Sequence, residues 1–228
     1  MKTIRAVHYL NQFFGQLGGE EMANLPPRIV DGPVGFGVTL KGASGGRVEI
    51  VRTVICGDNY AAENTEELAK EVLRWVSETS PDLFLAGPAF GAGRYGIASG
   101  TLCKEVRGKL GIPSVTAMHP VNPGVEMAGH EVFVVEAKDS AQDLKRVLPM
   151  MLDIGIRLVD GLSIGNPGEE GYLPRGVRVN VRATKRGSAR AVQMLLKKLA
   201  GEPFETELPM PTYDRVLPAA PVRDLARA

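Results

Sequence analysis

The sequence predicts a doubly wound α/β fold, in which a mostly parallel sheet lies between two layers of helices. Short aliphatic runs alternate along the chain with amphipathic helical patterns, which is typical of βαβ units. Turns rich in glycine, proline and asparagine separate the two kinds of segment. With 44% hydrophobic residues among 228, the chain can bury a large core. We therefore expect a three-layer domain of Rossmann or flavodoxin type over residues 1–200, followed by an extended, proline-rich arm or linker over residues 201–228.

The aliphatic runs are interpreted as the strands of this sheet. They cover residues 4–10, 48–55, 82–86, 113–117 and 131–137. Between the first two runs lie residues 15–46, which are rich in glycine and proline, with a short helix expected at 34–41. This connection is long for a βα unit, and loops of such length in compact domains tend to be functional.

Amphipathic spacing predicts further helices between and after these strands. They cover residues 64–80, 98–110, 140–158 and 188–199. Asn64 is expected to cap the first of them, and Glu67, three residues later, completes a capping box. Ser140 is expected to cap the third.

Charge and cysteine content exclude several classes of function. Lys and Arg total 27 against 26 Asp and Glu, so the chain has no electrostatic footprint for nucleic acid. Its two cysteines cannot form a disulfide framework and are interpreted as reduced thiols. No apolar run approaches the ~20 residues that cross a bilayer, and no secretory signal is visible. We expect a cytoplasmic protein without membrane or nucleic-acid partners.

The carboxyl ends of the predicted strands are the expected position of the site, because open parallel sheets bind ligands there. Polar or glycine-containing segments follow four of these strands. They are Asn11-Gln12, Cys56-Gly57-Asp58-Asn59, Gly87-Pro88-Ala89-Phe90 and Met118-His119-Pro120.

Cys56 and His119 are the candidate catalytic residues. A thiol at a strand end beside a following helix lies near N–H donors that lower its pKa, but the alternative is a small buried hydrophobe. His119 precedes Pro120 at a strand end, which suits acid–base work, although turn histidines are often structural. Cys103 lies beside the apolar stripe of a predicted helix and is interpreted as structural.

The candidate substrate-binding residues are Asn11, Gln12, Asp58, Asn59, Gly91, Gly93 and Arg94. Asp58 and Asn59 either bind a ligand or form an Asx-turn that begins a helix. Gly91 and Gly93 precede a helix N-terminus, where backbone N–H groups can hold a carboxylate or phosphate. The loop has neither the P-loop lysine nor the spacing of the dinucleotide fingerprint. Arg94 is either a bidentate anion ligand or a surface arginine, and no spacing matches a metal site.

Several long segments carry a resemblance to a known family. They are HYLNQFFGQLGGEE, TVICGDNYAAENTEE, PDLFLAGPAFGAGRYGIASGTLCKEV, NPGEEGYLPRG and FETELPMPTYDRV. In order and over essentially the whole chain, they resemble the amino-terminal half of the selenoprotein B subunit in component B of the glycine, sarcosine and betaine reductases.

The resemblance implies reductive C–N cleavage of a small amino-acid-like amine. In that family a companion subunit carries a pyruvoyl group that captures the amine as a Schiff base, and a selenol takes the carbon fragment. The resemblance therefore implies no cofactor on this chain. The pyruvoyl group and the selenocysteine are expected on partner subunits of an oligomeric complex.

The chain departs from the family pattern at the redox centre. The family's selenocysteine, in a U-x-x-C context, lies in its carboxyl-terminal half, and this chain has no C-x-x-C. Ser99 stands where family members often carry a second cysteine, four residues before Cys103. We expect a separate partner containing selenocysteine or cysteine to supply that half, so that the chain alone is inactive.

Two alternatives remain open on the sequence. One is a stand-alone enzyme with Cys56 as nucleophile, since the CGDN strand end resembles that of aspartate/glutamate racemase-like proteins. The other is a non-catalytic assembly protein on the same fold. The resemblance also leaves open whether the chain is a split subunit, a fragment or a repurposed homologue, and which amine is the substrate.

Overall fold

The computed structural model describes residues 3–176 and 184–205, and confirms the doubly wound α/β class. The strands form one six-stranded sheet in the order β2-β3-β1-β4-β5-β6. All neighbours are parallel except β2, which runs antiparallel to β3. The strands are β1 (Ile4–Asn11), β2 (Arg28–Asp31), β3 (Val48–Cys56), β4 (Leu83–Phe90), β5 (Ser114–Met118) and β6 (Phe133–Glu136).

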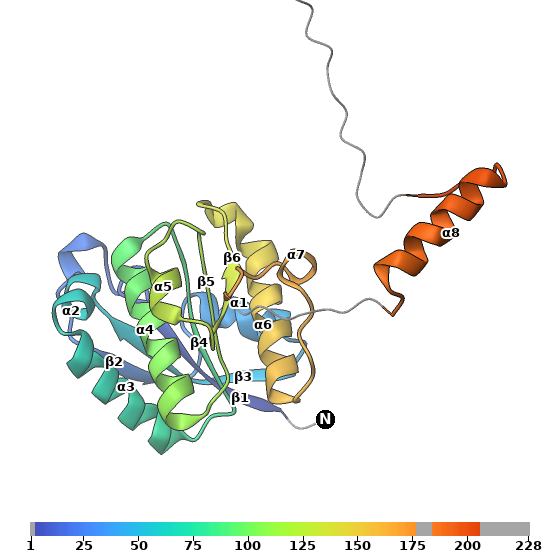
Figure 1. Ribbon diagram of the computed structural model, residues 1–228. Helices are drawn as coiled ribbons and strands as arrows, with labels where there is room; N and C mark the ends of the chain where they lie inside the picture. Colours follow the sequence, from blue (N-terminus) through green and yellow to red (C-terminus); the bar gives the residue numbers. More distant parts are fainter. Residues whose placement is uncertain (1–2, 177–183, 206–228) are drawn as a thin grey trace, which may run out of the picture. The chain divides into compact units, whose positions relative to one another are not determined.

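Helices cover both faces of the sheet, so the domain has three layers (Figure 1). One face packs against α2 (Asp58–Glu63), α3 (Thr65–Thr79), α4 (Gly93–Leu110) and α5 (Gly124–Ala128). The other face packs against α1 (Phe36–Ala43) and α6 (Leu144–Val159). Two hydrophobic clusters result, one on each side of the strands, because side chains alternate between the faces of a sheet. The remaining helices are α7 (Pro167–Glu170) and α8 (Gly187–Leu199).

β2 is an edge strand that the sequence analysis assigned to the long connection. Prolines precede it and a glycine follows it, so its four residues have the appearance of a turn. Its pairing is non-local: Arg28 lies opposite Ile55 and Asp31 lies opposite Arg52. The antiparallel edge lengthens the sheet beyond its parallel strands.

The capping box predicted at Asn64 is wrong. The side chain of Asn64 makes no capping hydrogen bond to α3, and its Nδ2 instead donates to the carbonyl of Tyr60 at 3.2 Å. The reason is that α2 ends at Glu63, so Asn64 is the joint between two consecutive helices. The cap predicted at Ser140 is also wrong, because α6 begins at Leu144 with Asp143 at its N-cap position. The hydroxyl of Ser140 instead accepts the N–H of Gln142, at 3.2 Å, in the 3₁₀ turn that precedes α6.

The chain divides into two compact units, Met1–Val177 and Arg178–Ala228. The sheet and its covering helices belong to the first unit, whereas α8 belongs to the second. This division falls earlier than the boundary expected near residue 200. Most of the predicted arm, from residue 206 onward, lies outside the described residues.

The segment NPGEEGYLPRG protects the open edge of the sheet beside β6. Tyr172 pairs antiparallel with Val135, and the N–H of Leu173 donates to the carbonyl of Val134 at 2.7 Å. Glu170 in α7 accepts two hydrogen bonds from Arg157 of α6, at 2.8 and 2.5 Å. An unpaired edge strand invites aggregation, so this strap has a structural role.

Glycines allow α4 and α5 to approach each other closely. A Cβ on Gly100 of α4 would overlap the carbonyl oxygen of Gly124, and a Cβ on Gly124 would overlap the backbone of Gly96. Gly108, two turns further along α4, has no atom near its Cβ position. The two helices therefore depend on glycine at specific contact positions.

This contact gives a matched pair of substitutions in one helix. Gly100→Ala forces backbone against backbone and should lower the free energy of unfolding by about 1–3 kcal/mol. Gly108→Ala meets open space and should raise it by about 0.5–1 kcal/mol, because alanine favours the helix. Urea unfolding of both variants measures the difference, and equal effects of the two substitutions would contradict the packing described here.

Candidate functional site

The carboxyl ends of β1 and β4 form the topological switch point of the sheet. The chain leaves β1 toward α1 on one face and leaves β4 toward α4 on the other, so the two connections diverge. Ligands of open α/β sheets bind in the crevice at such a point. Among the predicted site residues, Asn11 ends β1 and Gln12 follows it, while Gly91 and Gly93 follow β4.

Asn11, Gln12 and Asp58 form a buried link between the ends of β1 and β3. Asn11 Nδ2 donates to Asp58 Oδ2 at 3.0 Å, and the N–H of Asp58 donates to Gln12 Oε1 at 3.0 Å. Asn11 Oδ1 also accepts the N–H of Phe14 at 2.9 Å. These three polar residues are 4%, 2% and 8% exposed. These hydrogen bonds fix Asp58, the first residue of α2, so the side chain of Asp58 is used in this link and not in an Asx-turn.

The carboxyl group of Asp58 lies in an environment that disfavours its charge. Burial raises its pKa, and the hydrogen bond from Asn11 opposes that shift only in part. Among the described residues, its Oδ1 has no hydrogen-bond partner, and the same is true of the hydroxyl of Tyr9. Both atoms are buried on the α2 and α4 side of the sheet. The arrangement favours a protonated carboxyl group more than an exposed aspartate would.

Arg94 holds the long connection against the rim. Its guanidinium donates to Asn59 Oδ1 and, at 2.8 Å, to Glu20 Oε1. The backbone N–H of Asn59 donates in turn to the carbonyl of Ala23 at 2.8 Å. The segment around residues 20–25 thus lies beside the start of α2. Arg94 is therefore engaged in an internal ion pair, and a carboxylate already occupies part of its guanidinium.

Cys56 is fully buried at the end of β3. Its Sγ lies 3.7 Å from the carbonyl oxygen of Leu25 and 3.5 Å from that of Gly57. Burial, together with the nearby charge of Asp58, raises the pKa of this thiol to about 12. Because the thiolate is the nucleophile, this environment opposes the catalytic role predicted for Cys56. The buried-hydrophobe alternative fits the geometry better.

His119 is half-buried after β5, far from Cys56. Its backbone N–H donates to the carbonyl of Phe90 at 3.0 Å, and its Nδ1 accepts the N–H of Val121 at 3.3 Å. Strands β1 and β4 separate β3 from β5, and three inter-strand steps amount to about 14 Å. The structure therefore does not join Cys56 and His119 as a nucleophile and its base. Acid–base work at Nε2 of His119 stays a prediction.

The glycine loop after β4 already holds a carboxylate of the chain itself. The N–H of Gly91 donates to Asp139 Oδ1 at 3.2 Å, and Gly93 begins α4. Asn122, from the turn before α5, donates through Nδ2 to the carbonyls of Phe90 and Ala92 at 2.9 and 3.2 Å. An external anion at Gly91 would have to displace Asp139.

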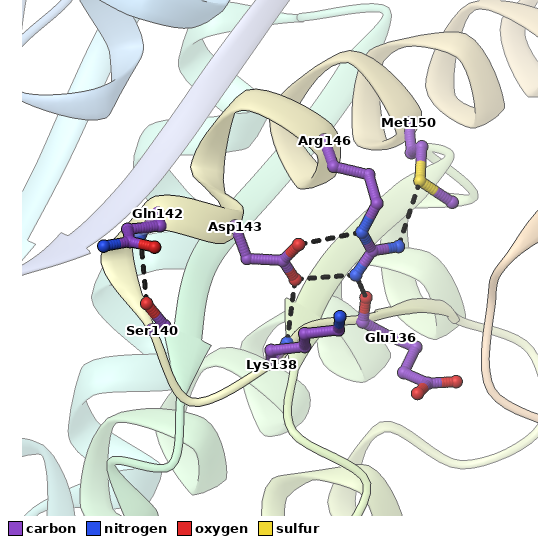
Figure 2. A network of polar contacts seen from close by, with 7 residues as sticks. All are labelled: Glu136, Lys138, Ser140, Gln142, Asp143, Arg146 and Met150. Atoms are coloured by element: carbon purple, nitrogen blue, oxygen red, sulfur yellow. Dashed lines mark hydrogen bonds and ion pairs between the residues drawn. The ribbon is translucent and has the colours of Figure 1, made fainter.

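The loop that carries Asp139 is fixed by a polar network around Asp143 (Figure 2). Asp143 accepts from both Nε and Nη2 of Arg146, at 2.8 and 2.6 Å, and from the N–H of Lys138 at 2.8 Å. Arg146 Nη2 also donates to the carbonyl of Glu136 at the end of β6. The Arg146 guanidinium lowers the pKa of Asp143, since it stabilises the carboxylate. The network thereby anchors the turn between β6 and α6.

Aromatic rings fill the space beneath the switch point. The ring centroid of Phe14 lies 4.5 Å from that of Phe36, 5.9 Å from that of Tyr95 and 6.1 Å from that of Phe90. These residues come from the long connection, α1, α4 and β4. The polar rim therefore rests on a packed apolar floor.

Three residues that shape the rim were not predicted from the sequence. Glu20 pairs with Arg94, Asp139 accepts the N–H of Gly91, and Asn122 donates to the carbonyl of Phe90. Asn122 and Asp139 follow strands β5 and β6, so their positions after strand ends could have indicated them. Glu20 lies within a long connection, where no periodicity pointed to it.

A hollow of about 330 Å³ lies at the opposite edge of the sheet, where β5 begins. Arg107, His130 and Arg175 are among the residues that line it. Arg175 donates to the carbonyl of His130 at 2.9 Å and its guanidinium lies 3.8 Å from the Phe133 ring centroid. These contacts hold the segment NPGEEGYLPRG against the sheet, so the basic residues that line the hollow have a structural role.

Within residues 3–176 and 184–205, no group of three or more His, Cys, Asp or Glu side chains is placed to hold a metal ion. In these ranges there is also no helix long and apolar enough to cross a bilayer.

Comparison with known proteins identifies the family. The sequence profile described as glycine/sarcosine/betaine reductase selenoprotein B matches residues 3–228. The chain belongs to this family. The resemblance predicted from the sequence motifs is thereby confirmed. No solved structure is significantly similar to the chain.

Curated relatives are similar over the whole of this chain. It is 52% identical to the glycine reductase complex component B subunit gamma of Carboxydothermus hydrogenoformans, covering 100% of the chain and 52% of that protein. It is 47% identical to the sarcosine reductase complex component B subunit beta of Peptoclostridium acidaminophilum, with the same coverage. Identity to the betaine reductase complex component B subunit beta of that organism is 43%, over 98% of the chain and 52% of the relative. The chain spans about half the length of these relatives.

The burial of Cys56 predicts slow alkylation. With a pKa of about 12, roughly one thiol in 10⁴ is ionised near pH 8, against about one in four for an unperturbed cysteine. Iodoacetamide should therefore label Cys56 in the folded chain at least about a thousandfold more slowly than in the chain unfolded in guanidinium. Peptide mass spectrometry separates this site from Cys103. Rates within about tenfold of each other would show that the thiol is reactive.

Proposed function

We propose that this chain is a module of a glycine/sarcosine/betaine reductase-type complex, which cleaves a C–N bond of a small amine reductively. Membership of the selenoprotein B family is the observation that carries the proposal. The relatives are named as components of glycine, sarcosine and betaine reductase complexes. The substrate class inferred from these names is a small nitrogen compound that bears a carboxylate. Which of these amines this chain serves stays open.

The redox centre of such a complex would come from outside this sequence. The chain has two cysteines, one in β3 and one in α4, and both are buried. Burial raises the pKa of Cys103 as well as that of Cys56. Neither thiol is suited to donate electrons, and no C-x-x-C pair exists. A selenocysteine- or cysteine-containing polypeptide region is therefore required as a partner.

A second partner would carry the pyruvoyl group that the family resemblance implies. When bound in the complex, the pyruvoyl and selenocysteine groups would supply amine capture and a strong nucleophile. This chain would contribute the wall of the cavity in which the amine sits. It is inferred to work in an oligomeric assembly in the cytoplasm.

Within the chain, the predicted substrate-binding residues would act in two ways. Asn11, Gln12 and Asp58 are buried and hydrogen-bonded to one another, so they would position the rim. Arg94 and Asn59 are more accessible, and the side chain of Arg94 is 46% exposed. They would be the contacts for a substrate carboxylate, because guanidinium recognises carboxylates bidentately.

The two alternative functions are supported less well. A stand-alone enzyme with Cys56 as nucleophile conflicts with the raised pKa and full burial of that thiol. A non-catalytic assembly protein on the same fold shares the family and the geometry. It differs from the proposed module in predicting that substitutions at Arg94 leave the activity of the assembled complex unchanged.

The proposal predicts that the purified chain is inactive alone and active in a complex. The chain should release no ammonia from glycine, methylamine from sarcosine or trimethylamine from betaine with a thioredoxin reducing system. Addition of the complementary subunits from the reductase complex of one of the curated relatives should produce turnover of one of these substrates. Arg94→Gln should then reduce kcat/KM about tenfold or more, corresponding to loss of a charge-assisted hydrogen bond.

The matched control for Arg94→Gln is Arg74→Gln on the exposed face of α3. Arg74 pairs with Glu71 and Glu78 of its own helix and lies away from the rim. Its substitution should leave kcat/KM unchanged. Turnover by the isolated chain would refute the modular role. An assembled complex unaffected by Arg94→Gln would favour the assembly protein.

A further inference from the structure

The hollow where β5 begins brings together basic side chains from three separate segments of the chain. Arg107 comes from the last turn of α4, His130 from the turn before β6, and Arg175 from the segment NPGEEGYLPRG. Its volume of about 330 Å³ lies at the lower end of the range for ligand pockets. The long-range fold, and not a basic run in the sequence, therefore assembles this cluster.

The two guanidinium groups at the hollow have no carboxylate partner in the part of the chain that the structure describes. Arg107 Nη1 donates to the carbonyl of Gly111 at 3.0 Å, and Arg175 Nη1 donates to that of His130 at 2.9 Å. Glu131 also lines the hollow but forms no ion pair with either group. By contrast, Arg157 of α6 pairs with both Asp153 and Glu170. Because a guanidinium has several N–H donors, Arg107 and Arg175 each retain donors for an anion.

The guanidinium of Arg175 is held in place before any ligand binds. It lies 3.8 Å from the ring centroid of Phe133, which is only 6% exposed. The Phe133 ring packs edge-on against Tyr172, with a centroid distance of 4.9 Å. A guanidinium on a ring face keeps the N–H groups at its edges available for bidentate hydrogen bonds to an oxyanion. A cation fixed in this way loses little conformational freedom on binding.

We infer that this hollow binds a phosphate group, either as free phosphate or as part of a small phosphorylated metabolite. A phosphate group carries more than one negative charge near neutral pH and accepts hydrogen bonds from several donors at once. Two guanidinium groups and the exposed imidazole of His130 meet that need. A single carboxylate needs only one guanidinium and would leave the other without an anion.

The phosphate site is distinct from the rim and does not depend on the proposed function. Ser114, which lines the hollow, begins β5, and Met118 ends the same strand at the rim. The four residue steps between them span about 13 Å. Arg94 and Gly91 lie at the rim end of the sheet. A ligand in the hollow therefore contacts residues other than those predicted to bind the substrate.

The test titrates the full ¹⁵N-labelled chain with sodium phosphate at low salt and follows the backbone amides by NMR. Sodium acetate at the same ionic strength is the control ligand. The variant is Arg107→Gln, and its matched control is Arg5→Gln. Arg5 Nη1 donates to the carbonyl of Ser80, the C-cap of α3, just as Arg107 donates to that of Gly111, the C-cap of α4. Each substitution removes one guanidinium and one bond to a helix end, but only Arg107 lines the hollow.

The wild-type chain should bind phosphate saturably, with a dissociation constant of about 1 mM or lower. The shifted amides should centre on Arg107, His130 and Arg175, and acetate should not reproduce them. Arg107→Gln should weaken phosphate binding about tenfold or more, because a charge-assisted hydrogen bond is lost, while Arg5→Gln should stay within about threefold of wild type. Shifts that do not saturate, shifts centred on Gly91 and Arg94, or equal weakening by both variants would overturn the inference.

Two further measurements keep the site testable if Arg107→Gln folds poorly. Arg175→Lys retains the positive charge but loses the planar donor pair, so it should still weaken phosphate binding about fivefold or more. Unchanged binding in Arg175→Lys would contradict bidentate recognition and overturn the inference. Glycerol 3-phosphate separates the two sources of the phosphate group. Tighter binding than that of phosphate would support a phosphorylated metabolite, and weaker binding would support free phosphate.

Discussion

The hydrogen bond between Asn11 and the buried carboxyl group of Asp58 is the interaction on which the arrangement of the rim depends. It joins the end of β1 to the start of α2 across 47 residues of sequence, at a distance of 3.0 Å. Asn11 and Cys56 lie opposite each other in the sheet, so the bond continues the strand pairing beyond the last pair of the ladder. Gln12 adds a second bond to the same residue. Because this link fixes α2, it also fixes Asn59, the partner of Arg94, and thereby the segment that contains Glu20.

A rim of this kind is better suited to hold a shape than to perform the chemical step. Its buried polar atoms mostly bond to one another, and its thiol is kept protonated by burial. The family contains reductase components that are about twice as long as this chain. A scaffold that positions substrate while a second region supplies the redox group would reconcile these two observations.

The positions of the parallel strands could be predicted from the sequence, because each is a short aliphatic run that ends in polar or glycine residues. The strand order was not predictable, and with it the partner of each rim residue, since Asn11 and Asp58 are brought together by pairing between β1 and β3. Asn64 failed as a helix cap because an additional helix precedes it, and a capping pattern does not report that context. β2 was missed because four residues between prolines and a glycine have too little pattern to reveal a non-local partner.

The predicted site residues do lie along the carboxyl edge of the sheet, but the environment of each side chain depends on distant segments. The burial of Cys56 involves Leu25 from the long connection, and the amide of Gly91 is occupied by Asp139 from beyond β6. Neither contact leaves a local signal in the sequence. The helix at residues 188–199 was predicted from its spacing, whereas its membership of a second compact unit was not. Local patterns thus predicted the parallel strands and the longer helices, and long-range contacts decided the chemical environment of their side chains.

The most direct measurement of the central claim is the stability of Asp58→Asn relative to the wild-type chain as a function of pH. Burial raises the folded-state pKa of Asp58, so the unfolded chain ionises first and the wild type loses stability as pH rises through the two pKa values. Asparagine keeps the acceptor for Asn11 and has no charge. The variant should therefore gain stability relative to wild type as the pH rises above about 4, where the carboxyl group of the unfolded chain ionises, and through the raised pKa of the folded state. A relative loss of stability in Asp58→Asn over the same range would show that the carboxylate is stabilised in the folded chain, and would contradict the account.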